Sequence, residues 1–267
     1  IDIKARFEPS EKIDHVDLFI ESENREFLVT ETITPTSIGE IYYIYDLSES
    51  TIKIFSKLFI WFECKLTNGS TYTFKPTIYY YDDNRVNWQS ISNNEFNIFW
   101  YGEDSTLGET ILGIANEGLS KINSFIDVPT PQDIRIYVYP NPLDLQNTLD
   151  FSGEITSWIA GHAKPSSDTI IVSLSNNSDK WAELRRQIPH ELTHILLYQK
   201  LGASYAHLPR WLNEGLATFA ELTPNLNYQT LLDKSFEKDS LIHIDTLCDT
   251  FPIDAANFQL AYAEAYS

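Results

Sequence analysis

The sequence predicts an α+β protein of two domains, a β-sandwich over residues 1–87 and a mixed domain over residues 88–267. Three observations predict this division. The first third of the chain consists of short β-branched and aromatic segments separated by turn residues, with no helical period. Polar clusters then interrupt the strand pattern at residues 82–93. Beyond them, strand-like segments alternate with longer amphipathic segments of helical period, which is typical of α+β proteins.

The N-terminal domain is expected to hold six or seven short strands. Residues 57–66 lead through Asn68-Gly69 into residues 71–74, which predicts a hairpin because Asn-Gly favours a tight turn. The number and spacing of the strands suit a small sandwich of immunoglobulin-like type. Earlier strands are expected at residues 3–7, 16–21, 26–33 and 40–45.

We expect this domain to be a spacer or a module that positions substrate rather than a second catalytic unit. The run Tyr79-Tyr80-Tyr81 has two interpretations, a platform for carbohydrate or peptide and an aromatic strand that fills a core or a domain interface. We favour the interface, because buried aromatic strands are the commoner case.

The second domain is expected to begin with a strand, a helix and a second strand. Residues 140–149 are polar and predict an irregular connection. A helix from about residue 179 to residue 201 contains Pro189, whose ring would clash with the carbonyl of Arg185 and remove one hydrogen bond, so the helix either kinks or restarts there. Ahead of it we expect strands at residues 96–101, 133–139, 155–160 and 169–174 and a helix at residues 107–125.

The most informative motif is His190-Glu191-Leu192-Thr193-His194, which lies on that helix. Histidines four residues apart project from one helix face about one turn from each other, so both imidazoles can reach a single metal ion. Glu191 lies beside this face, where a carboxylate can take a proton from a water at the metal without being a ligand.

A third ligand should come from a second helix, and Glu214 fits this role. Gly202 is expected to end the first helix and Pro209 to begin the next. Two neutral imidazoles and one carboxylate bind zinc tetrahedrally and leave the fourth position for catalysis. The alternative interpretation, two ordinary half-buried histidines and a solvated Glu191, requires one helix to combine these groups without a chemical reason.

This pattern resembles the gluzincin metallopeptidases, in which HExxH is followed by a glutamate on the next helix. The spacing equals that of the thermolysin-like branch, whereas residues 211–219 look more like the aminopeptidase N branch and the bacterial and archaeal peptidase MA-like domains. The resemblance is strongest over residues 185–222. It implies a zincin-like fold, peptide-bond hydrolysis of a peptide or protein substrate, Glu191 as catalytic base, and Zn2+ bound by His190, His194 and Glu214.

Further roles depend on the same resemblance. Gluzincins supply a tyrosine or histidine downstream that stabilises the oxyanion, and Tyr262 is our candidate, with an aromatic in the core as its alternative. His207 and His243 compete for this role, and His162 could contact substrate. Each of these three is more often an ordinary surface histidine. A strand at residues 169–172 looks similar to the edge strand that pairs with substrate main chain.

The chain departs from the resemblance at two places. Thr218 stands where thermolysin-like enzymes have an aspartate that orients a histidine ligand, so that acceptor must be a hydroxyl, a backbone carbonyl or another group. The chain also lacks the GxMEN segment with which aminopeptidases hold a free amine. We therefore expect an endopeptidase, with an aminopeptidase or a catalytically inactive binding and assembly module as alternatives.

The composition limits the partners. With 38 acidic residues against 19 basic ones the formal net charge is −19, which disfavours nucleic acid and anionic lipid. No apolar run is long enough to span a bilayer. Cys64 and Cys248 form no disulfide framework or thiolate metal site, and we expect both to be unpaired and buried.

The ends of the sequence suggest a piece of a longer chain. It begins at Ile1 without methionine and ends in a helical pattern, so we expect a mature or trimmed chain, with a domain that continues beyond residue 267 as one alternative. The resemblance implies an extracytoplasmic protein, secreted or anchored outside these residues.

Overall fold

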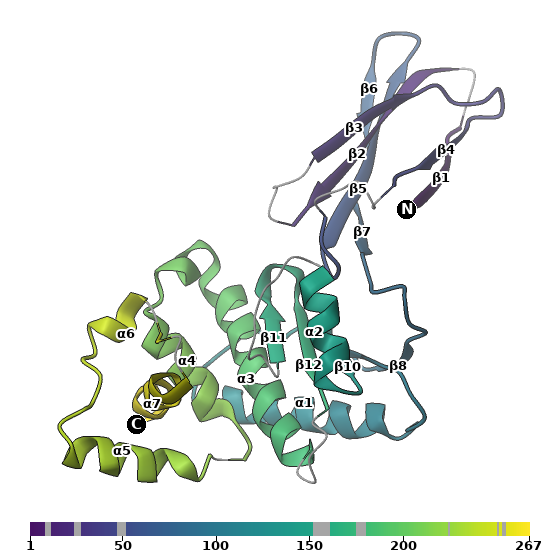
Figure 1. Cartoon of the computed structure of the whole chain (residues 1–267). Coiled ribbons are helices and arrows are strands. Elements are labelled where there is room, and N and C mark those ends of the chain that lie inside the picture. The colour runs from purple at the N-terminus through teal and green to yellow at the C-terminus, as the bar shows by residue number, and fades with distance from the viewer. Residues whose placement is uncertain are drawn as a thin grey trace. The chain divides into compact units, whose positions relative to one another are not determined.

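The chain forms two compact units, Ile1–Arg85 and Val86–Ser267. The first unit consists of strands, and the second contains a mixed sheet followed by helices (Figure 1). The predicted α+β class is therefore confirmed, and the predicted strand at residues 155–160 lies outside the described residues. The structure is a computed structural model that describes residues 1–8, 12–23, 28–46, 52–151, 161–174, 180–223, 225–249, 251–252 and 255–267.

The N-terminal unit is built from antiparallel sheets. One sheet pairs β1 (Asp2–Arg6) with β4 (Glu40–Ile44), and the other has the order β3-β2-β5-β6, with β7 also paired to β5. Ile3, Leu18 and Leu58 from both sheets share one buried cluster, so the sheets pack face to face. The immunoglobulin-like type stays a prediction. The remaining strands are β2 (Ile13–Ser22), β3 (Leu28–Ile33), β5 (Lys57–Leu66), β6 (Thr71–Thr73) and β7 (Thr77–Tyr80).

The predicted hairpin at Asn68-Gly69 is present between β5 and β6. Gly69 has a φ of 84°, a backbone conformation that glycine adopts without a steric penalty. Its N–H donates to the carbonyl of Leu66 at 2.8 Å and closes the turn.

The second unit has a five-stranded sheet of order β11-β12-β10-β9-β8. The inner strands β9 (Phe96–Trp100), β10 (Ile134–Tyr139) and β12 (Thr169–Ser173) are parallel, and helix α1 (Leu107–Asn123) connects the first two. The edge strands β8 (Gln89–Ser92) and β11 (Gly161–Lys164) are antiparallel. The predicted elements at residues 96–101, 107–125, 133–139 and 169–174 agree with this arrangement.

Two expectations for this unit are wrong. The predicted edge strand at residues 169–172 is β12, which pairs with β10 and β11, so among the described residues the outer strand at this side of the sheet is β11. Helix α2 (Pro142–Phe151) replaces the irregular connection, because Leu145 and Leu149, one helical turn apart, are buried although the rest of the segment is polar. Strand β8 was not predicted; it lies within the boundary region at residues 82–93, and a short polar edge strand has little hydrophobic pattern.

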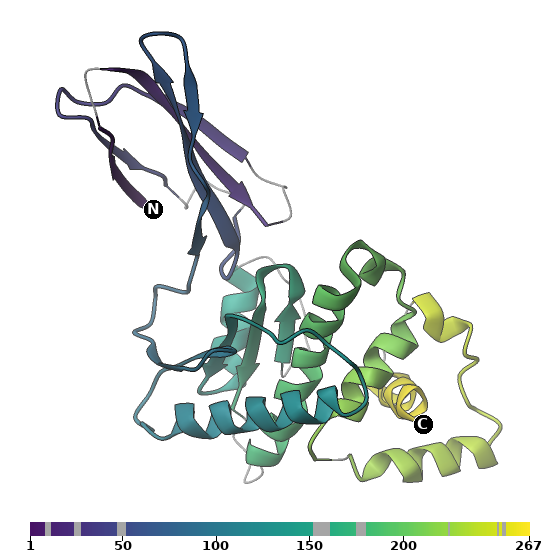
Figure 2. The same ribbon diagram turned by 180° about the vertical axis from the view of Figure 1, so that it is seen from behind.

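Helices cover both faces of this sheet. Ile136, Ile170 and Val172 share a buried core with α1 and with α3 (Lys180–Leu201), and α1 runs along this face (Figure 2). Residues of opposite parity, including Tyr137 and Tyr139, are buried on the other face, where α2 packs against β10 and β12. The alternation of a strand thus determines which residues meet α3.

Pro189 lies inside α3, and the helix continues through it without restarting. The carbonyl of Arg185, which proline deprives of its helical partner, accepts the backbone N–H of Leu222 at 2.9 Å. Gly118 of α1 provides room for the ring, since a Cβ there would lie 2.9 Å from Cγ of Pro189. The lost helical hydrogen bond is therefore replaced by one that ties the segment after α4 to α3.

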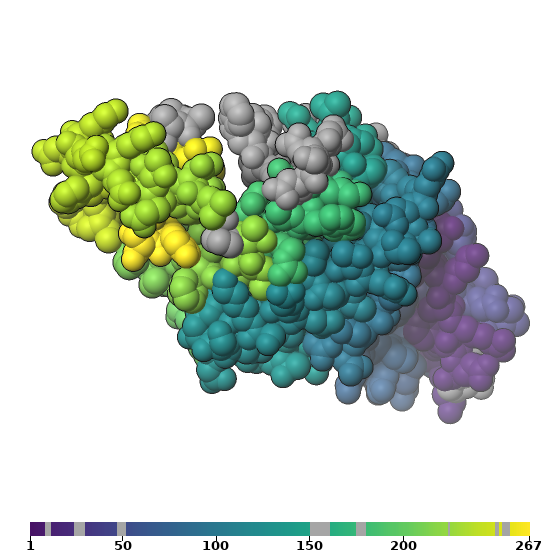
Figure 3. All heavy atoms as spheres, turned by 90° about the horizontal axis from the view of Figure 1, so that it is seen from below, coloured from purple at the N-terminus to yellow at the C-terminus, as the bar shows by residue number. Residues whose placement is uncertain are grey.

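The chain ends in helices that pack beside α3. The short 3-10 helix η3 (Gly202–His207) leads into α4 (Arg210–Ala220), and Gly202 has the positive φ of 53° expected where α3 ends. The helices α5 and α7, lime and yellow in Figure 3, lie together at one side of this unit. No described helix is long and apolar enough to cross a membrane. The last helices are α5 (Asn227–Glu237), α6 (Thr246–Asp249) and α7 (Ala255–Tyr266).

Candidate metal centre

Helices α3 and α4 bring His190, His194 and Glu214 together. The two histidines are one turn apart on α3, and their ring centroids are 5.0 Å apart. One ligand atom from each of the three residues lies within 4.8 Å of the others. Oε2 of Glu214 is 3.3 Å from Nε2 of His190 and 3.6 Å from Nε2 of His194.

These separations suit a small tetrahedral ion. Bonds of about 2.0–2.1 Å to nitrogen and oxygen place neighbouring ligand atoms of a tetrahedral zinc site about 3.4 Å apart. His194 and Glu214 are buried, each with 8% of the residue exposed, so few waters compete with an ion for their ligand atoms. The cluster therefore fits a metal ion.

The outer nitrogens of both histidines are hydrogen-bonded to acceptors. Nδ1 of His190 lies 3.3 Å from Oε1 of Glu221, and Nδ1 of His194 lies 3.0 Å from Oδ1 of Asn213. A carboxylate and an amide oxygen only accept, so each Nδ1 donates its hydrogen. The nitrogen that each ring turns toward Glu214, and that would bind a metal ion once deprotonated, is therefore Nε2.

Glu221 is a site residue that the sequence interpretation missed. It follows Glu214 by two helical turns at the end of α4, on the same helix face, and this spacing was the available signal. The bond from Leu222 to the Arg185 carbonyl holds this segment against α3, beside His190. Thr218, where the acceptor was sought, is buried, and its hydroxyl has no hydrogen-bond partner among the described residues.

The charges of the cluster are strongly coupled. Burial opposes protonation of His190, but hydrogen bonds to Glu214 and Glu221 and the charge of Glu191 outweigh it and raise the pKa of His190 to about 10. Burial alone would raise the pKa of Glu214. The hydrogen bonds that Glu214 makes with His190 and His194, together with the charges of these two residues, instead hold its pKa far below the usual value. In the absence of a metal ion, a proton on His190 takes the place of a cation.

Glu191 lies between the histidine cluster and the edge strand β11. A Cβ at Gly161 would be 3.1 Å from Oε1 of Glu191 and 3.3 Å from its Cγ. A side chain at residue 161 would therefore crowd the carboxylate of Glu191, and glycine leaves that space open. The negative charge of Glu191 raises the pKa values of both His190 and Tyr262. Glu191 therefore borders the cluster but does not belong to the set of ligand atoms.

Tyr262 of α7 lies beside the cluster, with its ring centroid 6.0 Å from that of His190. Burial, the charges of Glu214 and Glu191 and a hydrogen bond to Glu214 raise the pKa of Tyr262 far above its usual value. The ring also packs edge-on against Phe251 at 5.2 Å and Phe258 at 4.8 Å. Both interpretations of this residue therefore have a structural basis, because an aromatic cluster holds the ring while the hydroxyl points toward the acids.

None of the three other candidate histidines belongs to the His190, His194 and Glu214 cluster. His243 is 77% exposed and pairs with Asp245. His162 pairs with Ile171 across β11 and β12, whereas Gly161 pairs with Val172, so His162 lies on the sheet face away from Glu191. His207 lines a pocket next to Glu214.

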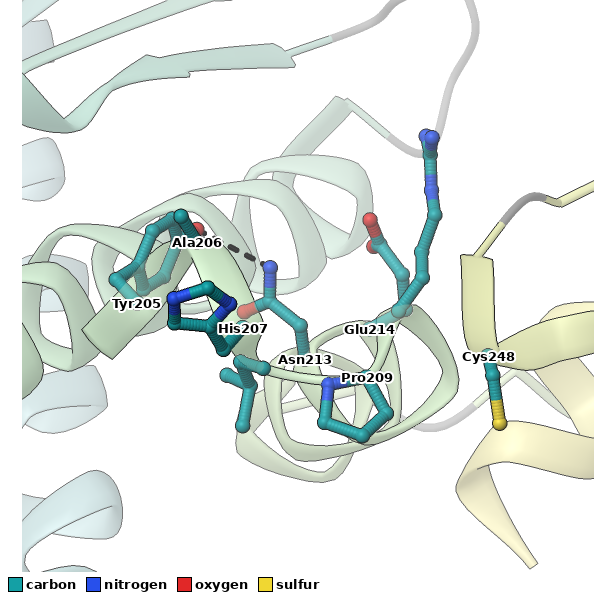
Figure 4. Close-up of a pocket in the computed structure, with 9 residues that line it drawn as sticks. Tyr205, Ala206, His207, Pro209, Asn213, Glu214 and Cys248 are labelled. Carbon is teal, nitrogen blue, oxygen red and sulfur yellow. Dashed lines mark hydrogen bonds between the residues drawn. The ribbon is translucent and has the colours of Figure 1, made fainter. Parts of the chain in front are cut away.

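That pocket opens between η3 and the start of α4 and has a volume of about 630 Å³. Figure 4 shows Tyr205 and His207 on one side and Cys248 of α6 on the other. The amide of Asn213 donates to the hydroxyl of Tyr205 at 3.1 Å, so one side chain connects the pocket wall to His194. Cys64 is buried as expected, while Cys248 is only half-buried; both are free thiols.

Comparison with known sequences agrees with this geometry. A sequence model described as the peptidase MA superfamily matches residues 114–267. The matched segment contains α3, α4 and α7, and therefore every residue of the cluster. No curated protein matches the chain.

Proposed function

The chain belongs to the peptidase MA superfamily, and on this basis we propose that it is a zinc metallopeptidase that cleaves within peptide chains. The observation that carries the proposal is the cluster of His190, His194 and Glu214. Both imidazoles direct Nε2 at the Glu214 carboxylate while their Nδ1 atoms are hydrogen-bonded to acceptors. That is the arrangement of a metal-ligand set, and open access to it from a pocket favours catalysis.

His190, His194 and Glu214 would hold the zinc ion, which supplies Lewis acidity that polarises a carbonyl and acidifies a water. Glu191 acts as general base, accepts a proton from the attacking water and passes it to the leaving nitrogen. Its position beside the cluster, with a glycine opposite, leaves its carboxylate free to move between these two partners. Tyr262 donates its hydroxyl hydrogen to the developing oxyanion, and its raised pKa keeps that hydrogen in place.

The edge of the sheet supports recognition of peptide main chain. The outer side of β11 has no strand partner among the described residues, and β11 approaches Glu191 at Gly161. An extended substrate that adds to β11 would place its backbone next to the general base. Main-chain pairing does not require a free amine, which favours an endopeptidase over an aminopeptidase.

The first experiment is hydrolysis of casein by zinc-loaded protein, beside Glu191→Gln and a chelated sample. We expect cleavage by the parent, loss by about 100- to 10,000-fold in Glu191→Gln, and zinc still bound to that variant. Equal activity of the variant and the parent would sink the proposed role of Glu191. An inactive parent would favour a binding or assembly module instead.

A second comparison separates the two kinds of peptidase. An N-acetylated peptide and its free-amine twin should be cleaved at similar rates at an internal bond. Preference for the free amine would identify an aminopeptidase.

For the N-terminal unit we propose an immunoglobulin-like sandwich that acts as a spacer or positions substrate. Its antiparallel sheets support this assignment. We also propose that the protein acts outside the cytoplasm, as the resemblance to peptidase MA-like proteins implies. Protease protection of the native chain in intact cells, compared with its degradation after lysis, would argue against this location.

A further inference from the structure

We propose that Arg210 selects substrates that place a carboxylate in the pocket beside Glu214, and this inference rests on the proposed peptidase function. Arg210 is the first residue of α4 and lies one turn before Glu214 on the same helix. Its side chain is exposed and lines the same pocket as Asn213 and Glu214. A guanidinium group there is within reach of a substrate bound at the metal centre.

In a strongly acidic protein, this pocket contains a guanidinium group. The whole chain has a formal net charge of −19, but among the described residues Glu214 is the only carboxylate that lines this pocket. Its charge is committed to His190 and His194, or to a bound metal ion. Among the described residues of the lining, Arg210 therefore carries the one permanent charge that is not paired within the metal-ligand cluster.

Arg210 also differs from other arginines of the chain in its partners. Arg85 binds both oxygens of Asp83, and Arg185 binds both oxygens of Glu117. Within the described part of the chain, Arg210 forms no ion pair. Arg210 instead makes a cation–π contact with Phe251, whose ring centroid lies 5.7 Å from the guanidinium carbon.

The contact with Phe251 orients Arg210 without consuming its hydrogen bonds. A cation–π contact of this kind uses none of the guanidinium N–H groups as hydrogen-bond donors, so they stay available to a ligand. Phe251 in turn packs against Tyr262. The charge of Arg210 reaches the Tyr262 hydroxyl, where it opposes the rise in pKa that burial chiefly causes.

A carboxylate is the ligand that this geometry favours. The planar fork of arginine matches its two oxygens, and charge-assisted pairs are stronger than neutral hydrogen bonds. The carboxylate could belong to the C-terminus of a peptide or to a Glu or Asp side chain. Both sources supply the same chemistry, and the experiment below separates them.

The test measures binding without turnover, in zinc-loaded Glu191→Gln. The probes are hexapeptide pools with an uncharged N-terminal fluorescent label, one position fixed as Glu or Gln and the others randomised over uncharged residues. A second pair of pools differs only in a C-terminal carboxylate or amide. We expect about tenfold tighter binding of the carboxylate member of at least one pair.

Three further substitutions in the same background assign that preference. In Arg210→Gln the ratio of the two Kd values should fall to about one while zinc affinity and binding of the uncharged pools stay unchanged. Arg210→Lys should keep part of the preference, because the charge remains without the fork. Arg6→Gln, which removes the same charge from an exposed site in the N-terminal unit, should keep all of it.

The inference and the proposed function fail in different ways. No carboxylate-dependent binding, or a preference that survives in Arg210→Gln, would overturn the inference even if the parent cleaves casein. Carboxylate binding through Arg210 by a parent that cleaves no peptide would contradict the proposed function and leave the inference standing. A preference in the Glu pools assigns a side-chain carboxylate, and one in the C-terminal pair assigns the chain end.

Discussion

At the level of single residues, the two histidines of the cluster are held by different acceptors. Asn213 precedes Glu214 in sequence, so α4 supplies a ligand and an acceptor from adjacent positions. Glu221 belongs to the end of the same helix and depends on the packing of that end against α3. The carboxylate is the stronger acceptor, since it is charged.

Replacing Glu221 tests this arrangement. We expect Glu221→Ala to weaken zinc binding about 10- to 100-fold, because Nδ1 of His190 loses the acceptor that sets its tautomer. The matched control is Thr218→Val, which removes a buried hydroxyl without a partner and should change zinc affinity little. Competition with a chromogenic chelator measures both values. Equal affinities of the two variants would contradict the role of Glu221.

The protonation of His190 predicts how zinc binding depends on pH. Its pKa in the metal-free folded state is about 10, above the ordinary 6.5, so it is protonated at pH 8 and must lose that proton to bind a metal ion. We expect release of about one proton from His190 per zinc ion at pH 8. Calorimetry in two buffers of different ionisation enthalpy measures this number, and a value near zero would contradict the raised pKa.

The same shifts determine the stability of the metal-free protein. The raised pKa of His190 stabilises the fold fully below pH 6.5, and this contribution is lost as pH rises through about 10. The lowered pKa of Glu214 stabilises the fold above about pH 4.5, its usual value, and this contribution is lost as pH falls through the depressed value. Both contributions are therefore fully present between about pH 4.5 and pH 6.5, where Glu214 is ionised and His190 is protonated.

At the level of elements, two close helix contacts position the site. Pro189 ties α3 to the segment after α4 through the Arg185 carbonyl, and its ring packs on Gly118 of α1. On the other side of α4, a Cβ at Gly215 would overlap the carbonyl oxygen of Ala265 in α7. A residue without a side chain therefore allows α7 to bring Tyr262 next to Glu214.

Substitution of Gly215 tests the second contact. We expect Gly215→Ala to destabilise the protein by about 1–3 kcal/mol, because backbone of α7 must move to accommodate the methyl group. Gly113→Ala is the matched control, since Gly113 lies in α1 with open space around it, and alanine there should stabilise by about 0.5–1 kcal/mol. Denaturant unfolding measures both. Stabilisation by both substitutions would show that α4 and α7 are not in close contact.

At the level of the whole molecule, the site belongs to one unit. All cluster residues and the core beneath them lie within Val86–Ser267. The described residues that form the core of α1, α3 and the sheet all belong to this unit. The second unit therefore has its own hydrophobic core and its own candidate metal ligands.

This independence predicts the behaviour of the isolated unit. We expect a chain of residues 86–267 to fold and to bind zinc with a Kd within about threefold of the full chain. Saturating zinc should raise its Tm, because an ion that binds the folded state alone stabilises it. An unfolded fragment, or one without zinc affinity, would show that the N-terminal unit is needed for the site.

The fold and the site were predictable where local patterns carry the signal. Histidines four apart on a helix, a glutamate on the next helix and the alternating strands all follow from the period of one element. Glu221, α2 and the edge strand β11 were missed, because each depends on which segment packs against which. The polar segment α2 is stabilised as a helix because Leu145 and Leu149 are buried where α2 packs against the sheet.

Local sequence patterns identified the family, the candidate ligand types and the helix that carries them, since chemistry of this kind needs particular residues at particular spacing. Tertiary structure alone decided that β11 is the edge next to Glu191, that Glu221 orients His190, and that Arg210 shares a pocket with Glu214. The physical reason is that these relations join segments far apart in the chain or depend on where α4 ends. Packing between distant segments determines these three relations, and such packing leaves no periodic pattern in the sequence.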